Sequence, residues 1–345
     1  MSKSLEKYKL NAKEKNNLEK IEGGFKINKD LLIAEEYLNN EHNIILFDLK
    51  SEKKILNISF HQGYITSFHI CKKPLYIDDK EIIYSNDSLY FLSSSLDKKF
   101  ALHQISFNNS TNEYSNYTLI SQCKPTHDEI NSVIQIENGQ ILITARDQSL
   151  ILFSNKIKNG NFEKLFEINQ PWPMAPDLLF EIRKNLIGVS WEYDDAEADE
   201  SYTEEMEKNN HSNDGIFIYS IDNNKIIEKK ILHGYYFGGK YSYIVMEDKL
   251  ILKKNSEIFV YNLNNYELRF KFQEYTYLKM KPFNEKYFIV YYKDGTKAII
   301  KLFNINSMKN EQSFEFQANN NVFKIFPISN NEYVFGNSIL TIDEV

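Results

Sequence analysis

Residues 141–155, ILITARDQSLILFSN, contain two apolar runs separated by a short polar turn around Asp147. Runs of this length, rich in Ile and Leu and interrupted by Asp and Ser, are typical of two β-strands joined by a tight turn. Both runs are apolar at consecutive positions, which indicates strands that are covered on both faces. We therefore predict that residues 141–155 form a buried β-hairpin.

The same spacing between a turn residue and the end of the following strand occurs elsewhere. In FLSSSLDKKFALHQI, residues 91–105, the turn Asp again stands six positions before the residue that ends the strand. A third copy, KNSEIFVYNL, has Asn in place of Asp. The pairs that share the spacing are Asp97 with His103, Asp147 with Phe153, and Asn255 with Tyr261.

A strand-end aromatic residue followed by a small polar residue recurs with a period. The steps from Tyr219 to Tyr261 and from Tyr261 to Phe303 are both 42 residues. A period of about 40–45 residues with four strands per unit is that of a β-propeller blade. The sequence therefore predicts an all-β, seven-bladed β-propeller with four antiparallel strands per blade. The predicted blades are residues 20–60, 61–120, 121–170, 171–234, 235–275, 276–318 and 319–345.

Composition narrows the class of protein further. Of the 345 residues, 42% are hydrophobic, which is enough for a large core, and the net charge of -7 argues against a broadly basic surface that reads phosphates. Two cysteines are too few for a disulfide framework. No signal peptide and no apolar stretch of about 20 residues is visible. We therefore expect a cytoplasmic protein without membrane insertion, for which nucleic acid is a disfavoured partner.

The repeat resembles that of the WD-repeat family, whose unit opens with Gly-His and ends its third strand in Trp-Asp. Phe47-Asp48 is the dipeptide nearest to Trp-Asp. In that family the early His, the turn Asp and the strand-three Trp share a hydrogen-bond network. The third blade keeps His127 and Asp147, but Phe153 cannot donate a hydrogen bond as an indole would, so the resemblance does not carry the complete network to this blade. The candidates for the early His are His61, His127 and His233.

The resemblance also implies a function. Proteins of this family mostly bind peptides and other subunits across their faces and rim, so we expect a non-catalytic protein–protein interaction scaffold that is a subunit of a larger complex. Its partners would be other protein subunits or peptides. No cofactor is implied.

The N-terminal segment, residues 1–19, is predicted to be distinct from the propeller of residues 20–345. The last blade supplies only about three strands, and residues 3–10, KSLEKYKL, would complete it as an outer strand that closes the ring. The alternative is a frayed or helical tail, because the segment also contains good helix formers. Residues 107–120, rich in Asn and Ser, are predicted to be a long hairpin loop.

An acidic loop is predicted at residues 193–214, between the second and third strands of the fourth blade. A segment this rich in Asp and Glu cannot pack against a core. It is either a docking arm for a basic partner or a solvated insertion, and its carboxylates lack the spacing of a calcium loop. The candidate partner-binding acids are Asp194, Asp195, Glu197, Asp199, Glu200, Glu204 and Glu205.

Two connections between blades carry aromatic residues that would suit a binding face. NQPWPMAPDLLF, residues 169–180, holds Trp172 among three prolines, and HGYYFGGKYSY, residues 233–243, holds Tyr235 and Tyr236. Exposed Trp and Tyr are good anchors for a partner. We expect both connections to lie on the same face, and the alternative is that they are only rigid joints.

Signals for catalysis are weak. His69 and Cys71 are only two potential ligands on one strand, Ser190 lacks the glycines of a nucleophile elbow, and no phosphate-binding loop is present. We predict no catalytic, metal or cofactor site. The alternatives are an enzyme with a site at the central channel and an RNA-binding propeller. The enzyme would need His, Asp or Glu side chains that point into the channel from the innermost strands of several blades. The segments expected to form such strands, YITSFHI, INSVIQI and VFKIFPI, offer few of these residues.

Overall fold

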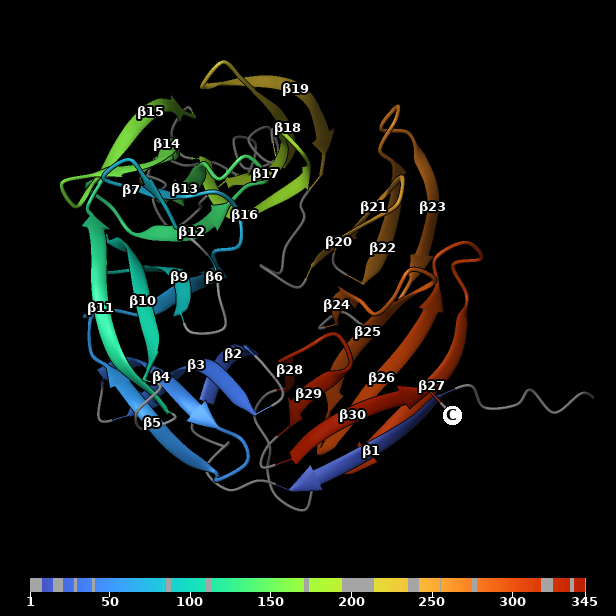
Figure 1. Ribbon diagram of the computed structural model, residues 1–345. Helices are drawn as coiled ribbons and strands as arrows, with labels where there is room; N and C mark the ends of the chain where they lie inside the picture. Colours follow the sequence, from blue (N-terminus) through green and yellow to red (C-terminus); the bar gives the residue numbers. More distant parts are fainter. Residues whose placement is uncertain are drawn as a thin grey trace, which may run out of the picture. The chain divides into compact units, whose positions relative to one another are not determined.

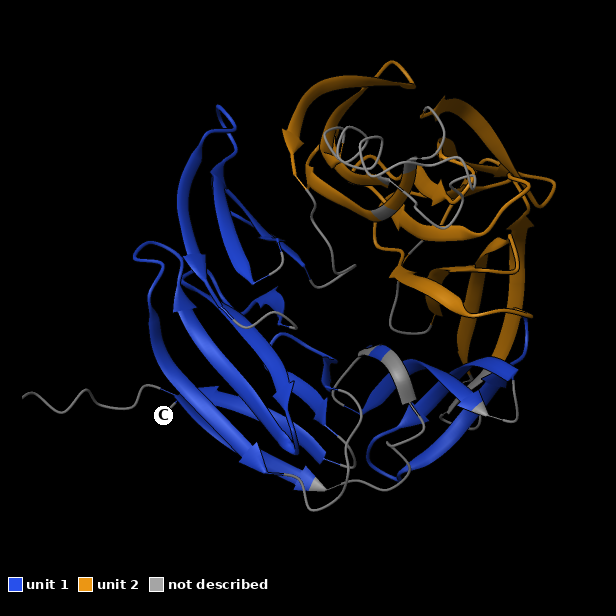
Figure 2. Ribbon diagram, turned by 180° about the vertical axis from the view of Figure 1, so that it is seen from behind, with its two compact units in different colours: residues 1–60, 241–345 blue, residues 61–240 orange. Residues whose placement is uncertain are grey.

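The computed structural model contains only β-strands, turns and irregular segments in the part of the chain that it describes (Figure 1). The described residues are 8–14, 21–27, 30–38, 41–82, 84, 88–108, 113–170, 174–193, 214–234, 242–254, 256–274, 278–317, 325–335 and 338–344. They fall into two compact units (Figure 2). Unit 1 comprises residues 1–60 and 241–345, and unit 2 comprises residues 61–240.

Unit 1 contains four antiparallel sheets of four strands each. One sheet is formed by β2 (Ile21–Lys26), β3 (Leu31–Leu38), β4 (Glu41–Asp48) and β5 (Lys53–Ile58). A second is formed by β20 (Tyr243–Met246), β21 (Lys249–Lys254), β22 (Glu257–Asn262) and β23 (Leu268–Gln273). A third is formed by β24 (Lys279–Pro282), β25 (Tyr287–Asp294), β26 (Lys297–Asn304) and β27 (Asn310–Gln317). The fourth is formed by β28 (Ile325–Pro327), β29 (Glu332–Phe335), β30 (Ser338–Glu344) and β1 (Tyr8–Glu14).

Unit 2 contains three sheets. The first is formed by β6 (Ile65–Ile70), β9 (Ser88–Ser95), β10 (Phe100–Asn108) and β11 (Glu113–Cys123). The second is formed by β12 (Ile130–Gln135), β13 (Ile141–Ala145), β14 (Ser149–Lys158) and β15 (Asn161–Asn169), which the short strands β7 (Tyr76–Ile77) and β8 (Lys80–Glu81) join. The third is formed by β16 (Met174–Arg183), β17 (Leu186–Tyr193), β18 (Gly215–Asp222) and β19 (Lys225–His233).

The predicted fold class is confirmed: the chain is an all-β, seven-bladed β-propeller by its seven sheets of antiparallel strands. The four main strands of each sheet fall within one predicted blade, with two exceptions: β11 ends at Cys123, just past the predicted boundary, and β1 comes from the N-terminal segment. The short strands β7 and β8 lie in the predicted blade 61–120 but join the next sheet. The loop predicted over residues 107–120 is wrong for most of its length. Its described residues belong to β10 and β11, because polar Asn and Ser side chains are tolerated on an outer strand that faces solvent.

The N-terminus supplies the fourth strand of the last sheet. β1 pairs with β30 in antiparallel register, from Tyr8 opposite Glu344 to Glu14 opposite Ser338. The ring of Tyr8 packs edge-on against those of Phe283 and Tyr287, which buries it. Within the described residues the strand covers residues 8–14, so it includes the end of the predicted segment 3–10 and continues beyond it, and these residues are not helical. Residues 3–7 lie outside the described part.

Within each unit the hydrophobic core lies between neighbouring sheets. In β13, Ile141 and Ile143 pack toward the sheet of β6 to β11, whereas Leu142 packs toward the sheet of β16 to β19. Successive side chains of a strand point to opposite faces. A strand buried on both faces must therefore be apolar at consecutive positions, which is the pattern of residues 141–155.

The hairpin of β7 and β8 fastens the first sheet of unit 2 to the second. It arises from the connection between β6 and β9, and β7 pairs in parallel with the end of β14. Asn155 Nδ2 donates to the carbonyl oxygen of Pro74 at 3.4 Å. Gly139 faces the same carbonyl with φ +86°, and a Cβ there would lie 1.9 Å from the oxygen. Only glycine fits this position.

Candidate functional site

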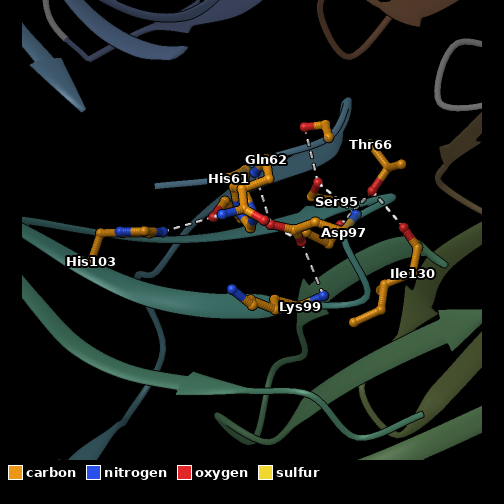
Figure 3. A network of polar contacts seen from close by, with 11 residues as sticks. His61, Gln62, Thr66, Ser95, Asp97, Lys99, His103 and Ile130 are labelled. Carbon is orange, nitrogen blue, oxygen red and sulfur yellow. Dashed lines mark hydrogen bonds and ion pairs between the residues drawn. The ribbon is translucent and has the colours of Figure 1, made fainter. Parts of the chain in front are cut away.

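A chain of polar side chains crosses the first sheet of unit 2 (Figure 3). His61 lies just before β6, and its Nδ1 is 3.1 Å from Oδ2 of Asp97, in the turn between β9 and β10. Nε2 of His61 lies 2.7 Å from Oγ of Ser93 on β9, and the same oxygen is 2.7 Å from Nε2 of His103 on β10. The chain ends at Tyr117, whose hydroxyl is 3.1 Å from Nδ1 of His103.

The turn that carries Asp97 is itself held in place. The Asp97 carboxylate accepts hydrogen bonds from the backbone N–H groups of Gln62, at 3.0 Å, and Lys99, at 3.1 Å. Nearby, Thr66 Oγ1 donates to the carbonyl oxygen of Ile130 at 2.7 Å, which connects this sheet to the next one (Figure 3). The loop before β6, the turn after β9 and the neighbouring sheet are therefore tied together.

Burial and charge set the protonation of this network. Burial opposes ionisation of Asp97, but the hydrogen bond and charge of His61 outweigh it and hold the pKa of Asp97 below its usual value. Burial, assisted by the nearby His61, lowers the pKa of His103 to about 3. Desolvation raises the pKa of Tyr117 to about 12. At neutral pH the network thus contains an ionised Asp97, a neutral His103 and a protonated phenol.

A carboxylate, an imidazole and a hydroxyl in a row are also the parts of a nucleophilic serine site. Here, however, both Ser93 and His103 are 0% exposed. The Ser93 hydroxyl is also engaged by two imidazoles, so a substrate carbonyl has no approach to it. What this arrangement can do is clamp the loop, the turn and two strands together.

The structure shows the network in the second blade, around His61, one of the three candidates for the early histidine. In the second sheet Ile143 and Phe153 occupy the positions of Ser93 and His103, and they belong to an apolar cluster. Asp147 there accepts a hydrogen bond from Ser149 Oγ at 2.5 Å. His127 is instead contacted through its carbonyl oxygen, which accepts from Lys98 Nζ at 2.7 Å.

In the third blade these two apolar side chains cannot relay hydrogen bonds, which agrees with the missing indole donor at Phe153. The sequence held a signal for the correct blade. Ser93 stands four positions before Asp97, and His103 is a polar ring at the strand-three position. Only the second blade combines these residues with an early histidine, His61.

A second buried contact lies in the third sheet of unit 2. The hydroxyl of Tyr219 on β18 accepts hydrogen bonds from Trp191 Nε1, at 3.0 Å, and from Gln170 Nε2, at 2.8 Å. Trp191 is 0% exposed, so its N–H has no access to water. The contact fixes the position of Gln170, the residue after which the Trp172 connection begins.

All of the predicted partner-binding residues lie outside the described residues. They are Trp172, Asp194, Asp195, Glu197, Asp199, Glu200, Glu204, Glu205, Tyr235 and Tyr236. Their placement is therefore a prediction that the structure does not test.

The described residues that flank these segments do lie together. At one end of the third sheet, Met174 is opposite Tyr193, and Gly215 is opposite both Trp191 and His233. The backbone N–H of Gly234 donates to the carbonyl oxygen of Asp214 at 2.8 Å. Residues 194–213 thus begin and end at one end of this sheet, and residues 171–173 and 235–241 each have one of their two ends there.

No group of three or more His, Cys, Asp or Glu side chains is placed to hold a metal ion within the described part of the chain. Cys71 is buried, and burial raises the pKa of its thiol far above the usual range, which disfavours the reactive thiolate. None of the described segments forms a helix that is long and apolar enough to cross a membrane.

Charged residues do occur on first strands, which the sequence analysis missed. Glu181 lies on β16, and Lys279 and Lys281 lie on β24. The segments that the sequence analysis considered contain no carboxylate, and Lys324 of VFKIFPI lies outside the described residues, so the charges on β16 and β24 were not anticipated.

Comparison with solved structures shows the fold. The chain is similar to the crystal structure of Sqt1 from Saccharomyces cerevisiae, with a TM-score of 0.61 and 11% identity over 93% of this chain and 83% of that one. It is also similar to the computationally designed Ika8 protein, with a TM-score of 0.55 and 10% identity over 96% and 98% of the two chains. No protein-family model and no curated protein matches the chain.

Proposed function

We propose that this protein is a non-catalytic scaffold for protein–protein interactions, a WD-repeat-like propeller that serves as a subunit of a larger complex in the cytoplasm. The observation that carries the proposal is that described residues flanking three segments, Met174, Tyr193, Gly215 and His233, lie at one end of the sheet of β16 to β19. One of the segments is acidic, and the other two contain Trp172, Tyr235 and Tyr236. Acidic side chains and large aromatic anchors at one place suit a basic peptide or a basic patch on another subunit.

The frame beneath these segments supports this role. Trp191 and Tyr219 are buried and hydrogen-bonded to each other, and Gln170 joins them. Loops built on a rigid scaffold are favoured positions for binding, because the scaffold keeps the ends of the loops fixed. The sealed network of Ser93 and His103 likewise supports a structural rather than a catalytic role for the polar residues of unit 2.

The test is a pair of variants of the full chain. In the first, residues 194–213 are replaced by a Gly/Ser linker of equal length, and in the second, Trp172, Tyr235 and Tyr236 are changed to alanine. We expect both to lose a co-purifying partner in a tagged purification that is analysed by mass spectrometry. Electrostatic contact with a basic partner also predicts weaker binding of the unmodified protein as salt increases.

The matched control is a Gly/Ser replacement of residues 109–112, which join β10 to β11 in the first sheet of unit 2. This variant should keep the partner, and all variants should unfold at the same temperature. A set of co-purifying proteins that is unchanged by either variant of the proposed surface would contradict the proposal.

A further inference from the structure

The sequence contains two Asn-Gly dipeptides, Asn138-Gly139 and Asn159-Gly160, and both lie in turns of the second sheet of unit 2. In such a pair the backbone nitrogen of the glycine can attack the side-chain amide carbon of the asparagine, because glycine has no side chain that hinders the approach. The attack requires a glycine N–H that is not hydrogen-bonded and an asparagine side chain that is able to turn. The two dipeptides differ in both respects.

The turn of Asn138 is locked. The N–H of Gly139 donates to the carbonyl oxygen of Ile136 at 2.8 Å. The Asn138 side chain is held at both ends, because its Oδ1 accepts from the N–H of Gln140 at 2.9 Å and its Nδ2 donates to Gln140 Oε1 at 2.7 Å. Gly139 is buried against the carbonyl oxygen of Pro74. The attacking nitrogen and the amide are thus both engaged in an enclosed place.

The turn of Asn159 is open. Asn159 and Gly160 form the two-residue connection between β14 and β15, with φ angles of 50° and 72°, and both residues are exposed. Two positive φ angles are typical of the hairpin turn that favours Asn-Gly. Among the described residues, neither the side-chain amide of Asn159 nor the N–H of Gly160 forms a hydrogen bond. Water therefore reaches both reacting groups.

We propose that Asn159 is a site of spontaneous deamidation. The Gly160 nitrogen attacks Cγ of Asn159 and forms an N–C bond, while its proton leaves with the side-chain amide nitrogen as ammonia. A cyclic imide remains. Water then adds to one of the two imide carbonyl carbons and breaks the C–N bond there. Opening at the side-chain carbonyl gives aspartate, and opening at the main-chain carbonyl gives isoaspartate, in which the backbone runs through the former side chain. The reaction consumes water, releases ammonia and needs no oxidant or reductant.

The products change the contact between this turn and the β7–β8 hairpin. The backbone N–H of Asn159 donates to Asp78 Oδ1 at 2.8 Å, and Lys158 Nζ lies 3.7 Å from Asp79 Oδ1. Either product places a new negative charge beside these two carboxylates, which repel it. Isoaspartate also lengthens the backbone of a turn whose geometry is set by two residues. Deamidation therefore loosens the attachment of the hairpin to β14.

The test is incubation of the full chain at pH 8 and 37 °C, with samples taken over several weeks. Peptide mass spectrometry measures the conversion of amide to acid at each asparagine, and an isoaspartyl methyltransferase labels isoaspartate. Asn138 is the matched control, because it also precedes a glycine. We expect Asn159 to react at least about ten times faster, which corresponds to a cost of about 1.4 kcal/mol or more for opening the locked turn. The rate at Asn159 should also rise with pH, because the attacking nitrogen must lose its proton.

Two variants connect the reaction to its consequence. Gly160→Ala adds a side chain at the attacking residue and should slow the modification of Asn159. Asn159→Asp supplies one of the products directly. In this variant and in the aged protein we expect faster hydrogen exchange at the backbone N–H of Asp78, which donates to the Ile157 carbonyl oxygen at 2.9 Å and so reports on the attachment of the hairpin.

The proposal is overturned if Asn159 stays unmodified in the folded protein, or if Asn138 is modified at the same rate. In urea the two asparagines should react at similar rates, because the locked turn no longer exists. A contrast that persists in urea would also contradict the proposal, since residues adjacent in sequence would then be its cause. These outcomes are independent of whether the protein retains its co-purifying partners.

Discussion

Nδ1 of His61 lies 3.1 Å from Oδ2 of Asp97, although the two residues are 36 positions apart in the sequence. This contact joins the loop before the first sheet of unit 2 to a turn in the middle of that sheet. His61 also hydrogen-bonds to Ser93 on β9, and Ser93 to His103 on β10. The pair of His61 and Asp97 is therefore the start of a chain of polar side chains that continues across β9 and β10 to Tyr117 on β11.

Asp97→Ala should lower the free energy of unfolding by about 2–3 kcal/mol, because the buried imidazole of His61 and two backbone N–H groups lose their acceptor. Urea unfolding at pH 7 measures the loss. The matched control is Asp147→Ala in the next sheet, where the carboxylate accepts from Ser149, and the cost should be about 1 kcal/mol or less. Equal losses in the two variants would contradict the role assigned to His61.

His103 should make stability depend on pH. Its pKa is about 3 in the folded protein, against about 6.5 in an unfolded chain, so the unfolded state binds more protons between these values. The free energy of unfolding should therefore fall as pH falls from 6.5 toward 3, by about 1.4 kcal/mol per pH unit at most.

The His103→Phe variant isolates this contribution, because Phe occupies the equivalent position, 153, in the next sheet. Urea unfolding of both proteins at pH 7, 6, 5 and 4 gives the difference in stability. We expect the advantage of the unmodified protein to shrink on acidification. A difference that stays constant from pH 7 to 4 would show that His103 does not titrate as proposed.

Gly139→Ala should destabilise the protein by more than about 2 kcal/mol, because it combines a positive φ of 86° with a Cβ that would lie 1.9 Å from the Pro74 carbonyl oxygen. Gly295→Ala is the control: it also has a positive φ, of 58°, but nothing lies within 4 Å of the added Cβ. There the cost should be about 1 kcal/mol. Thermal unfolding distinguishes them, and a Gly139→Ala protein as stable as Gly295→Ala would mean that the β7–β8 hairpin is not held against this site.

Tyr219→Phe should cost about 1–3 kcal/mol, because it leaves the buried indole N–H of Trp191 without an acceptor. Tyr333→Phe is a matched change, since the Tyr333 hydroxyl is buried but has no hydrogen-bond partner among the described residues. Removing it should change stability by less than about 0.5 kcal/mol or raise it slightly. Chemical denaturation measures the free energy of unfolding of both variants. A larger loss for Tyr333→Phe than for Tyr219→Phe would contradict the prediction.

The fold was largely predictable from the sequence because its signals are local. The turn Asp at position 147, the apolar runs on either side and the 42-residue step from Tyr219 to Tyr261 each depend on neighbouring residues or on simple repetition. The outer strands were harder to place. The strand that pairs with β30 was predicted at residues 3–10, whereas β1 covers residues 8–14. Residues 107–120 were predicted to be a loop, but the described ones belong to β10 and β11, because an outer strand needs little apolar character.

The candidate site was less predictable. Histidines and aspartates that fit the repeat occur in more than one blade, and the sequence left His61, His127 and His233 as candidates for the early histidine. The geometry selects His61 with Asp97, because only there do Ser93 and His103 continue the hydrogen bonds. The acidic and aromatic segments remain a prediction, which is supported by the convergence of their described flanks at the third sheet of unit 2.

The sequence by itself determined the strands, their turns and the number of sheets, because alternation, apolar runs and turn residues act over a few positions. Only the tertiary structure decided which polar groups are satisfied and which are not. The two Asn-Gly dipeptides illustrate the difference: Gly139 packs against the carbonyl oxygen of Pro74 and its N–H is hydrogen-bonded, whereas Gly160 lies in an exposed turn. Desolvation and pairing are properties of a neighbourhood in space, and that neighbourhood exists only once the sheets have packed.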